Sequence, residues 1–418
     1  MLSNTQPTYT GPYAPAPIRL LNTVARRSKP ISDKLMPLEL HDLVESACRK
    51  TGLSDWGDQR FKEALKALLD SVGKEGQLTF FGRFALRQFL VDNLCRRLRI
   101  IETVKRFPEI GQQKIQQPIF ITGWYRTGST YLHNLLASHP NMRAPLLWEL
   151  RHPCPAVDPR QVDSQKSIRK VHRTNRIHRY LSPGFSVAHA MPAEKPEECL
   201  HLFENAFCGT AGFFITEAKT YAWWLLDQDV QYGYEFYNMQ LQLLNWQRPG
   251  HQWVLKWPYH LWHLDTLLKT FPDATILQLH RDPGAAIGSV CSLAAIARSS
   301  FCASIDAAAL GQFWLDYNEA GLQRGFSVRQ KTGADQIIDI RYPDLMADPL
   351  AETNRILKAV DLGSDPIWLN SLWANLKTPP QKKQVSHRYA PSQFGLDPGK
   401  MRERFTTYMA DYQLAPTG

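Results

Sequence analysis

Apolar side chains recur with helical spacing between residues 36 and 107. In FKEALKALLDSV, which begins at Phe61, the apolar positions fall on one stripe, and the pattern continues in FFGRFALRQFLVDNLCRRLRIIETVKRF. Residues 1–35 differ, because they are rich in Pro, Thr and Asn. We therefore expect an extended or wrapping, Pro-rich arm over residues 1–35 and a helical N-terminal region over residues 36–115.

The pattern changes after Gln117. PIFIT (118–122) is a short apolar run between Pro and Gly, which is typical of a buried parallel strand, and GSTYLHNLLASHP follows with helical spacing. Further strand-like runs precede helical patterns at Leu146–Trp148, Trp253–Lys256, Thr275–Leu279 and Ile337–Ile340. Alternating strands and helices predict an α/β fold, a parallel sheet with helices on both faces, over residues 116–418.

Composition narrows the class of protein. The 418 residues are 44% hydrophobic and carry a net charge of +10, which favours an anionic ligand or surface. No run of five or six like charges occurs, so a nucleic-acid partner is not expected. The seven cysteines form no C-x-x-C pair, which indicates a reducing compartment and no zinc site. Without a secretory signal or an apolar run of membrane-spanning length, we expect a cytoplasmic protein with no membrane span.

The segment GWYRTGST joins the predicted strand at 118–122 to the predicted helix. Gly123 and Gly128 have the spacing of a phosphate-binding P-loop, and the helix that follows offers free N–H groups and a favourable dipole. However, Ser129 and Thr130 follow Gly128, where a Walker loop needs Lys and then Ser or Thr. The nearest cation, Arg126, lies inside the loop. Such a loop suits one phosphate-like group better than a metal-bound polyphosphate.

A second strand–turn–helix unit lies at ATILQLHRDPGAAIGSVCSL (274–293). Arg281 ends its strand and Ser289 lies on its helix, so the two side chains can meet over one phosphate. The alternative is an Arg281 side chain that caps or pairs with Asp282. This second unit strengthens the interpretation of the first loop as an anion site.

Together, RTGSTYLHNLL and HRDPGAAIGSVCSL resemble the two signatures of sulfotransferases that use 3′-phosphoadenosine 5′-phosphosulfate (PAPS). The resemblance runs from about Pro118 to the C-terminus, and PEECLHLFE, WVLKWPYHLWHLDTLL and HRYAPSQFGLDPGKMRERFTTY are similar to a bacterial branch of that superfamily. It implies that residues 116–418 form a PAPS-dependent sulfotransferase domain. The expected acceptor is a hydroxyl or amine of a small aromatic or lipophilic molecule, the product is adenosine 3′,5′-bisphosphate, and no metal is required.

The resemblance also implies roles for individual residues. In the first loop, the residues expected to bind the donor are Arg126, Thr127, Gly128, Ser129 and Thr130. Tyr131, the residue after the loop, is expected to bind the donor by stacking on adenine. Elsewhere in the chain, Arg281 and Ser289 are expected to bind the 3′-phosphate of the donor, and Tyr342 is expected to bind its base. His387 and Arg388 are expected to bind the donor from a C-terminal lid. Arg126 stands where cytosolic members have Lys, so it is also expected to stabilise the leaving oxygen. For Tyr131 and Tyr342 the alternative is an ordinary place in the core.

The acceptor's proton needs a base within hydrogen-bond reach, and the sequence offers two candidates. Glu149, in APLLWELRHP, is the favoured one, because it ends a predicted strand close to the loop, where protein-tyrosine and heparan-type sulfotransferases place a catalytic glutamate. His260, in LKWPYH, lies near the Lys-Thr-His of cytosolic members; Lys256 matches that Lys, but Pro258 holds the His position. The alternatives are an ion pair with Arg151 for Glu149 and a helix cap for His260. The aromatic-rich segment 190–262 is expected to line the acceptor pocket.

Two rival functions remain. A P-loop kinase or another nucleotide-dependent phosphoryl transferase needs a Lys after Gly128 and an Asp-led metal site, and neither is visible in the sequence. A binding module without catalysis is disfavoured because both anion sites and a candidate base are present.

Overall fold

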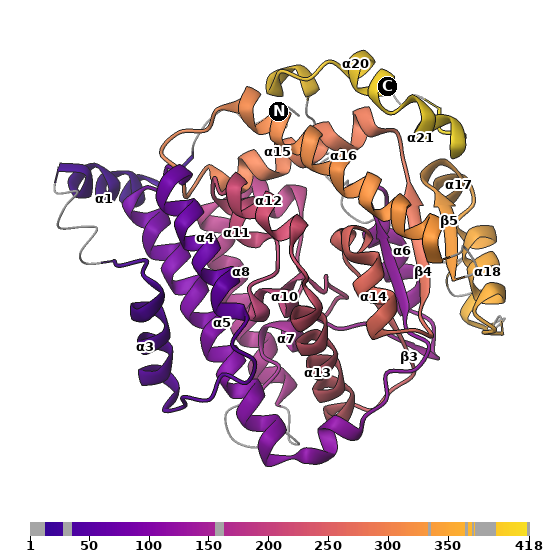
Figure 1. Ribbon diagram of the computed structural model, residues 1–418, viewed down its shortest axis with the longest axis horizontal. Helices are drawn as coiled ribbons and strands as arrows, with labels where there is room; N and C mark the ends of the chain where they lie inside the picture. The colour runs from indigo at the N-terminus through magenta and orange to yellow at the C-terminus, as the bar shows by residue number, and fades with distance from the viewer. Residues whose placement is uncertain are drawn as a thin grey trace, which may run out of the picture.

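The computed structural model describes residues 13–27, 36–154, 163–332, 336–363, 367–369, 372 and 390–415. Five strands of this part form one sheet in the order β2-β3-β1-β4-β5, and every neighbouring pair is parallel. The strands are β1 (Ile119–Gly123), β2 (Met142–Arg143), β3 (Gln252–Lys256), β4 (Thr275–His280) and β5 (Ile337–Arg341). Figure 1 shows the sheet edge-on among the helices.

Alternate side chains of β1 enter different cores. Ile119 and Ile121 pack with leucines of α6 (Ser129–Ala137) and with α18 (Pro349–Ala359), while Phe120 joins the core that contains α13 (Gln231–Gln247) and α14 (Leu264–Thr270). Both faces of the sheet are therefore covered, which explains why its strands read as continuous apolar runs. The predicted α/β fold is confirmed.

The predicted strand at Leu146–Trp148 is wrong. The edge strand β2 ends at Arg143, and α7 (Leu147–Arg151) occupies most of the predicted run. The backbone N–H groups of Leu147 and Trp148 donate to carbonyls of Lys195 and Ala193, and the Glu149 carboxylate accepts from the N–H of Leu146. These bonds stabilise a helical turn in place of a sheet ladder. The other four predicted strands are confirmed within a residue or two.

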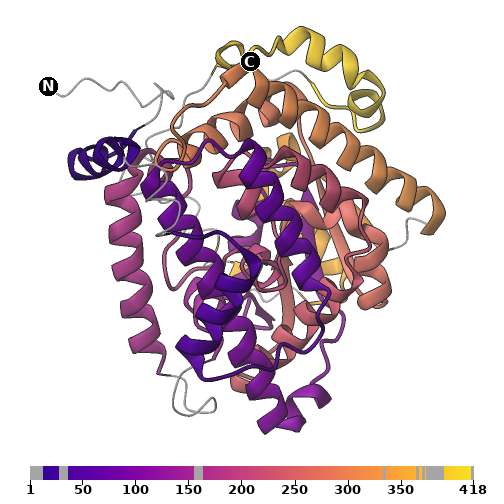
Figure 2. The same cartoon turned by 60° about the vertical axis from the view of Figure 1, so that its left-hand side comes forward.

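The N-terminal region is helical, as predicted. Its helices are α3 (Leu40–Thr51), α4 (Phe61–Glu75) and α5 (Phe80–Arg106), and the apolar stripe that begins at Phe61 is buried. The extended conformation predicted for the arm is wrong for Ala16–Arg27, which form α1 along the start of α5 (Figure 2). Ile18, Asn22 and Ala25 are partly buried at helical spacing, and the Asn22 side chain accepts from the Phe81 N–H at 3.0 Å.

One core runs through both regions. It contains side chains from Leu38 to Leu414, so the division into residues 36–115 and 116–418 stays a prediction about domains and does not separate two cores. All seven cysteines are free thiols. No helix in the described ranges is long and apolar enough to cross a membrane.

The remaining α-helices are α8 (Ser164–Leu181), α9 (Pro183–Ala188), α10 (Leu200–Phe203), α11 (Ala211–Ile215), α12 (Lys219–Asp227), α15 (Pro283–Arg298), α16 (Ala307–Thr332), α17 (Tyr342–Ala347), α20 (Pro398–Arg404) and α21 (Thr406–Asp411). The 3-10 helices are η1 (Pro108–Gln112), η2 (Glu204–Ala206), η3 (Pro258–His263) and η4 (Pro391–Phe394).

Candidate active site

The loop between β1 and α6 depends on two glycines. Gly123 has φ 129°, and a Cβ there would lie 2.4 Å from the Leu279 carbonyl oxygen on β4. Gly128 has φ 85° and directly precedes α6, with the Tyr342 ring 3.2 Å from where its Cβ would be. Thr127 pins the turn by donating its hydroxyl to the Trp124 carbonyl at 2.8 Å. The loop therefore brings its backbone to the N-terminus of α6 in a conformation that larger residues would strain.

The two predicted anion motifs meet in space. The Arg126 Nε donates to the Ser289 Oγ at 3.1 Å, and the Arg281 guanidinium donates to the Arg126 carbonyl. The same guanidinium lies 4.1 Å from the centroid of the Tyr342 ring. The Arg281 Nε is buried and has no hydrogen-bond partner in the described structure. Four residues predicted to bind the donor thus form one cluster beside Gly128.

Lys256 reaches the loop from the neighbouring strand. It pairs in register with Ile121 near the end of β1, and its side chain is 1% exposed. Its Nζ donates to the Thr130 Oγ1 at 3.2 Å and to a carboxylate oxygen of Glu198 at 2.5 Å. Glu198 was not among the predicted site residues, although it lies in the PEECLHLFE segment that resembles the family.

The carboxylate next to Glu198 is engaged differently. Glu197 lies 3.7 Å from the His189 ring and is buried. Burial alone favours the neutral acid, but the hydrogen bond and charge of His189 hold the pKa of Glu197 well below its usual range. Burial likewise opposes the charged His189, whose pKa is nevertheless raised by its contact with Glu197. Glu197 is therefore held by an ion pair, while Glu198 faces Lys256.

Glu149 lies away from this loop. Its carboxylate is 3% exposed and accepts from the Leu146 N–H (2.8 Å), from Arg143 (3.1 Å) and from Arg248 (2.9 Å). Arg143 pairs in register with Trp253. Lys256 is three residues further along β3, or roughly 10 Å at 3.3 Å per residue. The ion pairs of Glu149 thus lie toward the amino end of the sheet, whereas the loop lies at its carboxyl end.

His260 lies in the apolar core. It is fully buried within η3, its Nδ1 lies 2.9 Å from the Tyr234 hydroxyl, and the rings of Phe120 and Phe203 pack around it. Burial lowers the pKa of His260 to about 3. The residue is not a helix cap, since Trp257 precedes η3, and its surroundings are those of a packing residue.

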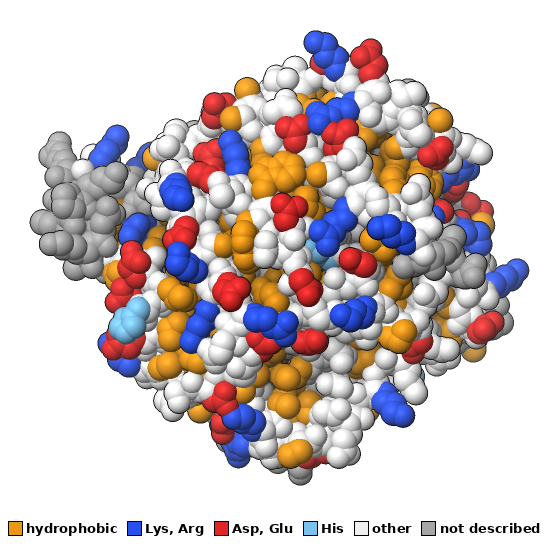
Figure 3. Space-filling view, viewed as in Figure 1, with side chains coloured by type: hydrophobic (Ala, Val, Ile, Leu, Met, Phe, Trp, Pro, Cys, Tyr) orange, Lys and Arg blue, Asp and Glu red, His pale blue; other side chains and the backbone are white. Residues whose placement is uncertain are grey.

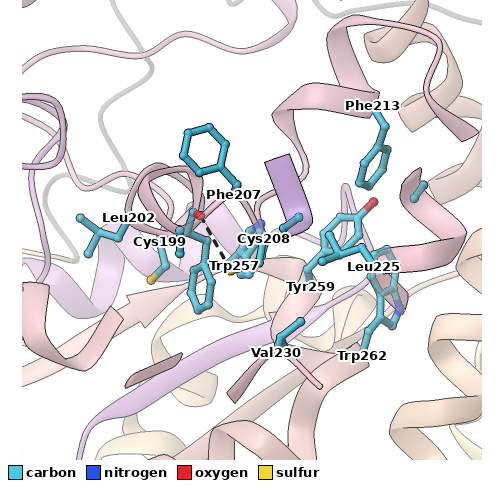
Figure 4. Close-up of a cluster of buried hydrophobic side chains, with 14 of the residues drawn as sticks. Cys199, Leu202, Phe207, Cys208, Phe213, Leu225, Val230, Trp257, Tyr259 and Trp262 are labelled. Carbon is cyan, nitrogen blue, oxygen red and sulfur yellow. Dashed lines mark hydrogen bonds between the residues drawn. The ribbon is translucent and has the colours of Figure 1, made fainter. Parts of the chain in front are cut away.

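Most aromatic side chains of segment 190–262 also belong to the core. Figure 4 shows Phe213, Trp257, Tyr259 and Trp262 in one cluster with apolar side chains such as Leu202 of α10 and Leu225 of α12, and each of these four aromatic side chains is at most 3% exposed. Two half-buried rings lie closer to the loop. Tyr125 is within it, and its ring centroid is 6.4 Å from that of Phe214 and 5.3 Å from that of Tyr259. The expected aromatic wall is therefore restricted to a few rings around Tyr125.

The remaining predicted residues have different outcomes. Tyr131 is partly buried on α6 and packs against the sheet. His387 and Arg388 lie outside the described residues, so the predicted lid is not described. Further along, α20 and α21 do contact both loops. Arg402 pairs with Asp282 at 3.0 Å, and the Trp124 ring stacks on Tyr408 with centroids 5.4 Å apart.

Comparison with known proteins decides the family. Residues 118–366, more than half of the chain, match the model of the sulfotransferase family. The chain belongs to this family. The match includes β1, the loop that follows it, Lys256, and the Arg281 and Ser289 motif.

Two mycobacterial crystal structures are similar to this sulfotransferase over nearly their whole length. Sulfotransferase STF1 from Mycobacterium tuberculosis H37Rv is 31% identical, with a TM-score of 0.77 over 88% of this chain and 98% of STF1. Sulfotransferase STF9 from Mycobacterium avium is 27% identical, with a TM-score of 0.79 over 90% of this chain and 97% of STF9. Comparison with curated protein sequences gave no match.

Proposed function

We propose that this sulfotransferase transfers the sulfuryl group of PAPS to a hydroxyl of a small acceptor. The observation that carries the proposal is the junction of the two anion loops, where Arg126 contacts Ser289 and Arg281 contacts the Arg126 carbonyl. A donor with a phosphosulfate at one end and a 3′-phosphate on its ribose fits two adjoining cradles. The buried, unpartnered Nε of Arg281 supports this fit, because buried donors are normally satisfied.

The same residues disfavour a kinase. Ser129 follows Gly128, so the Lys that a Walker loop extends to the far phosphates is missing. Lys256 reaches the loop from β3 instead, and its Nζ donates to the hydroxyl of Thr130, the residue after Ser129. A cation placed there suits one anionic group at the N-terminus of α6.

Bound PAPS supplies the sulfuryl group and the phosphate leaving group. Arg126, Lys256 and the N-terminus of α6 provide positive charge and hydrogen-bond donors for the oxygen that becomes charged. Tyr342 and Arg281 hold the nucleotide side, and Ser289 adds a hydroxyl. Each of these groups is fixed by a contact in the protein, so little reorganisation is needed when charge develops.

We place the general base at Glu198. Its carboxylate is 16% exposed and contacts Lys256 beside the loop, whereas Glu149 is held by two arginines and His260 lies in the core. Glu198 takes the proton from the acceptor hydroxyl, and Lys256 stabilises the carboxylate before that step. The half-buried rings of Tyr125 and Phe214 offer an apolar contact for an aromatic or lipophilic acceptor.

Calorimetric titration tests this proposal. Adenosine 3′,5′-bisphosphate is expected to bind without Mg²⁺, and Arg281→Ala is expected to weaken it. The matched control is Lys269→Ala, which removes an exposed cation on α14. Binding of ATP with Mg²⁺, together with no binding of the bisphosphate, would instead support a kinase. A mass-spectrometric screen of cell extracts with a labelled sulfate donor then identifies the acceptor.

A further inference from the structure

Two helices that the active site does not use meet on one side of the molecule. The Tyr13 N–H, just before α1, donates to the Ser299 carbonyl at 3.1 Å. The Ser300 hydroxyl donates to the carbonyl of Leu181, the last residue of α8, at 2.6 Å. The start of α1 and the end of α8 are therefore anchored on the same turn, and Figure 2 shows both helices along one edge of the protein.

α8 is strongly basic and only half of it is packed. Its 18 residues include six Lys or Arg and no Asp or Glu. Its buried residues (Ser167, Ile168 and Val171) all lie in the first half. Between residues 172 and 180 every side chain is exposed except Asn175, which is half-buried. The exposed set includes Ile177 (50%) and Tyr180 (56%), so apolar side chains stand in water among the cations.

α1 has the same character. Leu20, Leu21 and Val24 are 67%, 41% and 60% exposed, and they lie on one side of the helix at spacings of three and four residues. Arg19 and Arg26 are exposed beside them. Phe84 on α5, the helix against which α1 packs, is 44% exposed. We call α1 and residues 172–180 of α8 the basic face.

The charge on this face is unbalanced. On the face seen in Figure 3, cationic and anionic side chains are interspersed. Along α8, the only ion pair between described residues joins His172 to Glu194 at 3.6 Å, and Asp163 caps its start. A second copy of this chain would bring the same cations together, which disfavours self-association through the face.

We infer that the basic face docks on an anionic membrane surface. Amphipathic helices with cations around exposed apolar residues bind at the headgroup boundary, where lipid phosphates attract Lys and Arg and the apolar side chains enter the acyl region. The face offers both cations and apolar side chains, and its exposed arginines make no ion pair within the described part of the protein. This docking does not depend on the proposed function.

The chain links this face to the active site. α9 follows α8 directly, and the next residue, His189, contacts Glu197 beside Glu198. Gly184 of α9 lies against Ile296 of α15, the helix that carries Ser289. When the protein is docked, the segment that leads into the active site therefore lies next to the bilayer.

Vesicle co-sedimentation of the full chain tests the inference. We expect binding to vesicles of phosphatidylcholine with 30% phosphatidylglycerol at low salt, far weaker binding to phosphatidylcholine alone, and loss at high salt. The triple variant R173Q/R176Q/R179Q is expected to lower the partition coefficient roughly 100-fold, because each cation near an anionic surface contributes about 1 kcal/mol. The control K74Q/K269Q/K358Q removes three exposed cations elsewhere and is expected to change binding less than threefold.

A second variant tests the apolar contribution. L20S/V24S removes exposed side chains only, so its melting temperature is expected to equal that of the parent while vesicle binding falls roughly tenfold. Equal losses in the triple variant and its control would show that net charge alone attracts the protein, and would overturn the inference. It is also overturned if the parent does not bind anionic vesicles and instead forms a dimer that L20S/V24S dissociates.

Discussion

Replacing Glu149 and Glu198 by their amides tests the proposal that Glu198, and not Glu149, is the general base. Glu149→Gln keeps the size of the side chain but removes the charge that faces Arg143 and Arg248, and it leaves a single acceptor oxygen for three donors. Arg143 is 11% exposed, so its charged hydrogen bond is worth about 1.5–3 kcal/mol. Arg248 is 51% exposed and contributes at most about 1 kcal/mol. We expect the free energy of unfolding to fall by about 2–4 kcal/mol, while the folded variant turns over normally.

Glu198→Gln differs in its effect on the reaction. The amide oxygen still accepts from the Lys256 Nζ, but the charge opposite this buried cation is lost, so the free energy of unfolding falls in this variant as well. The amide cannot take a proton, so the chemical step is expected to slow by roughly 10²–10⁴-fold. Single-turnover kinetics with one common acceptor measures the step, and urea unfolding measures stability. A stable but inactive Glu149→Gln, or a fully active Glu198→Gln, would refute the assignment of the base.

Three further predictions follow from the site and the core. Arg281→Ala and Ser289→Ala are each expected to weaken adenosine 3′,5′-bisphosphate in calorimetry, Arg281→Ala by about 1.5–3 kcal/mol; unchanged affinity in both would remove the 3′-phosphate assignment. Arg126→Ala is expected to lower kcat more than nucleotide affinity, with partial recovery in Arg126→Lys, whereas a raised KM at constant kcat would limit Arg126 to binding. Burial raises the pKa of Glu204 from 4.5 to about 7, so the folded state retains a proton that the unfolded chain releases. The free energy of unfolding should therefore fall by roughly 3 kcal/mol as the pH rises from 4.5 to about 7. Urea unfolding over this pH range measures the change, and an equal pH dependence in the parent and Glu204→Gln would contradict the prediction.

Sequence patterns predicted elements well where burial and local geometry agree. PIFIT begins with Pro and is followed by Gly, and its apolar residues form β1, because a strand covered on both faces favours a continuous apolar run. The apolar run Leu146–Trp148 has the same appearance but forms part of a buried helical turn. Its backbone bonds go to Ala193 and Lys195, which are almost 50 residues away, and a short apolar pattern does not encode such a partner.

The two anion motifs were recognisable because each is a contiguous strand–turn–helix unit. Glu198 was not recognisable from the sequence, because its partner Lys256 is 58 residues further along the chain. The contact depends on the backbone bond from the Cys199 N–H to the Lys256 carbonyl, at 3.0 Å, which fixes the PEEC segment against the end of β3. Glu149 was favoured on the assumption that its segment is a strand that ends near the loop. The helix α7 and two arginines place its carboxylate elsewhere.

The cations around the loop support the proposed anionic donor, although this P-loop lacks the Walker Lys. A Walker Lys comes from the loop itself, whereas here Lys256 comes from β3 and Arg281 from the residue after β4. In the sheet order β1 lies between these two strands, so the two cations flank the loop on opposite sides. Arg126, with φ 63°, bridges toward β4 by presenting its carbonyl to Arg281 and its Nε to Ser289. Positive charge is thus distributed across the carboxyl edge of the sheet, and this favours a ligand with two separated anionic groups over one with a linear, metal-bound triphosphate.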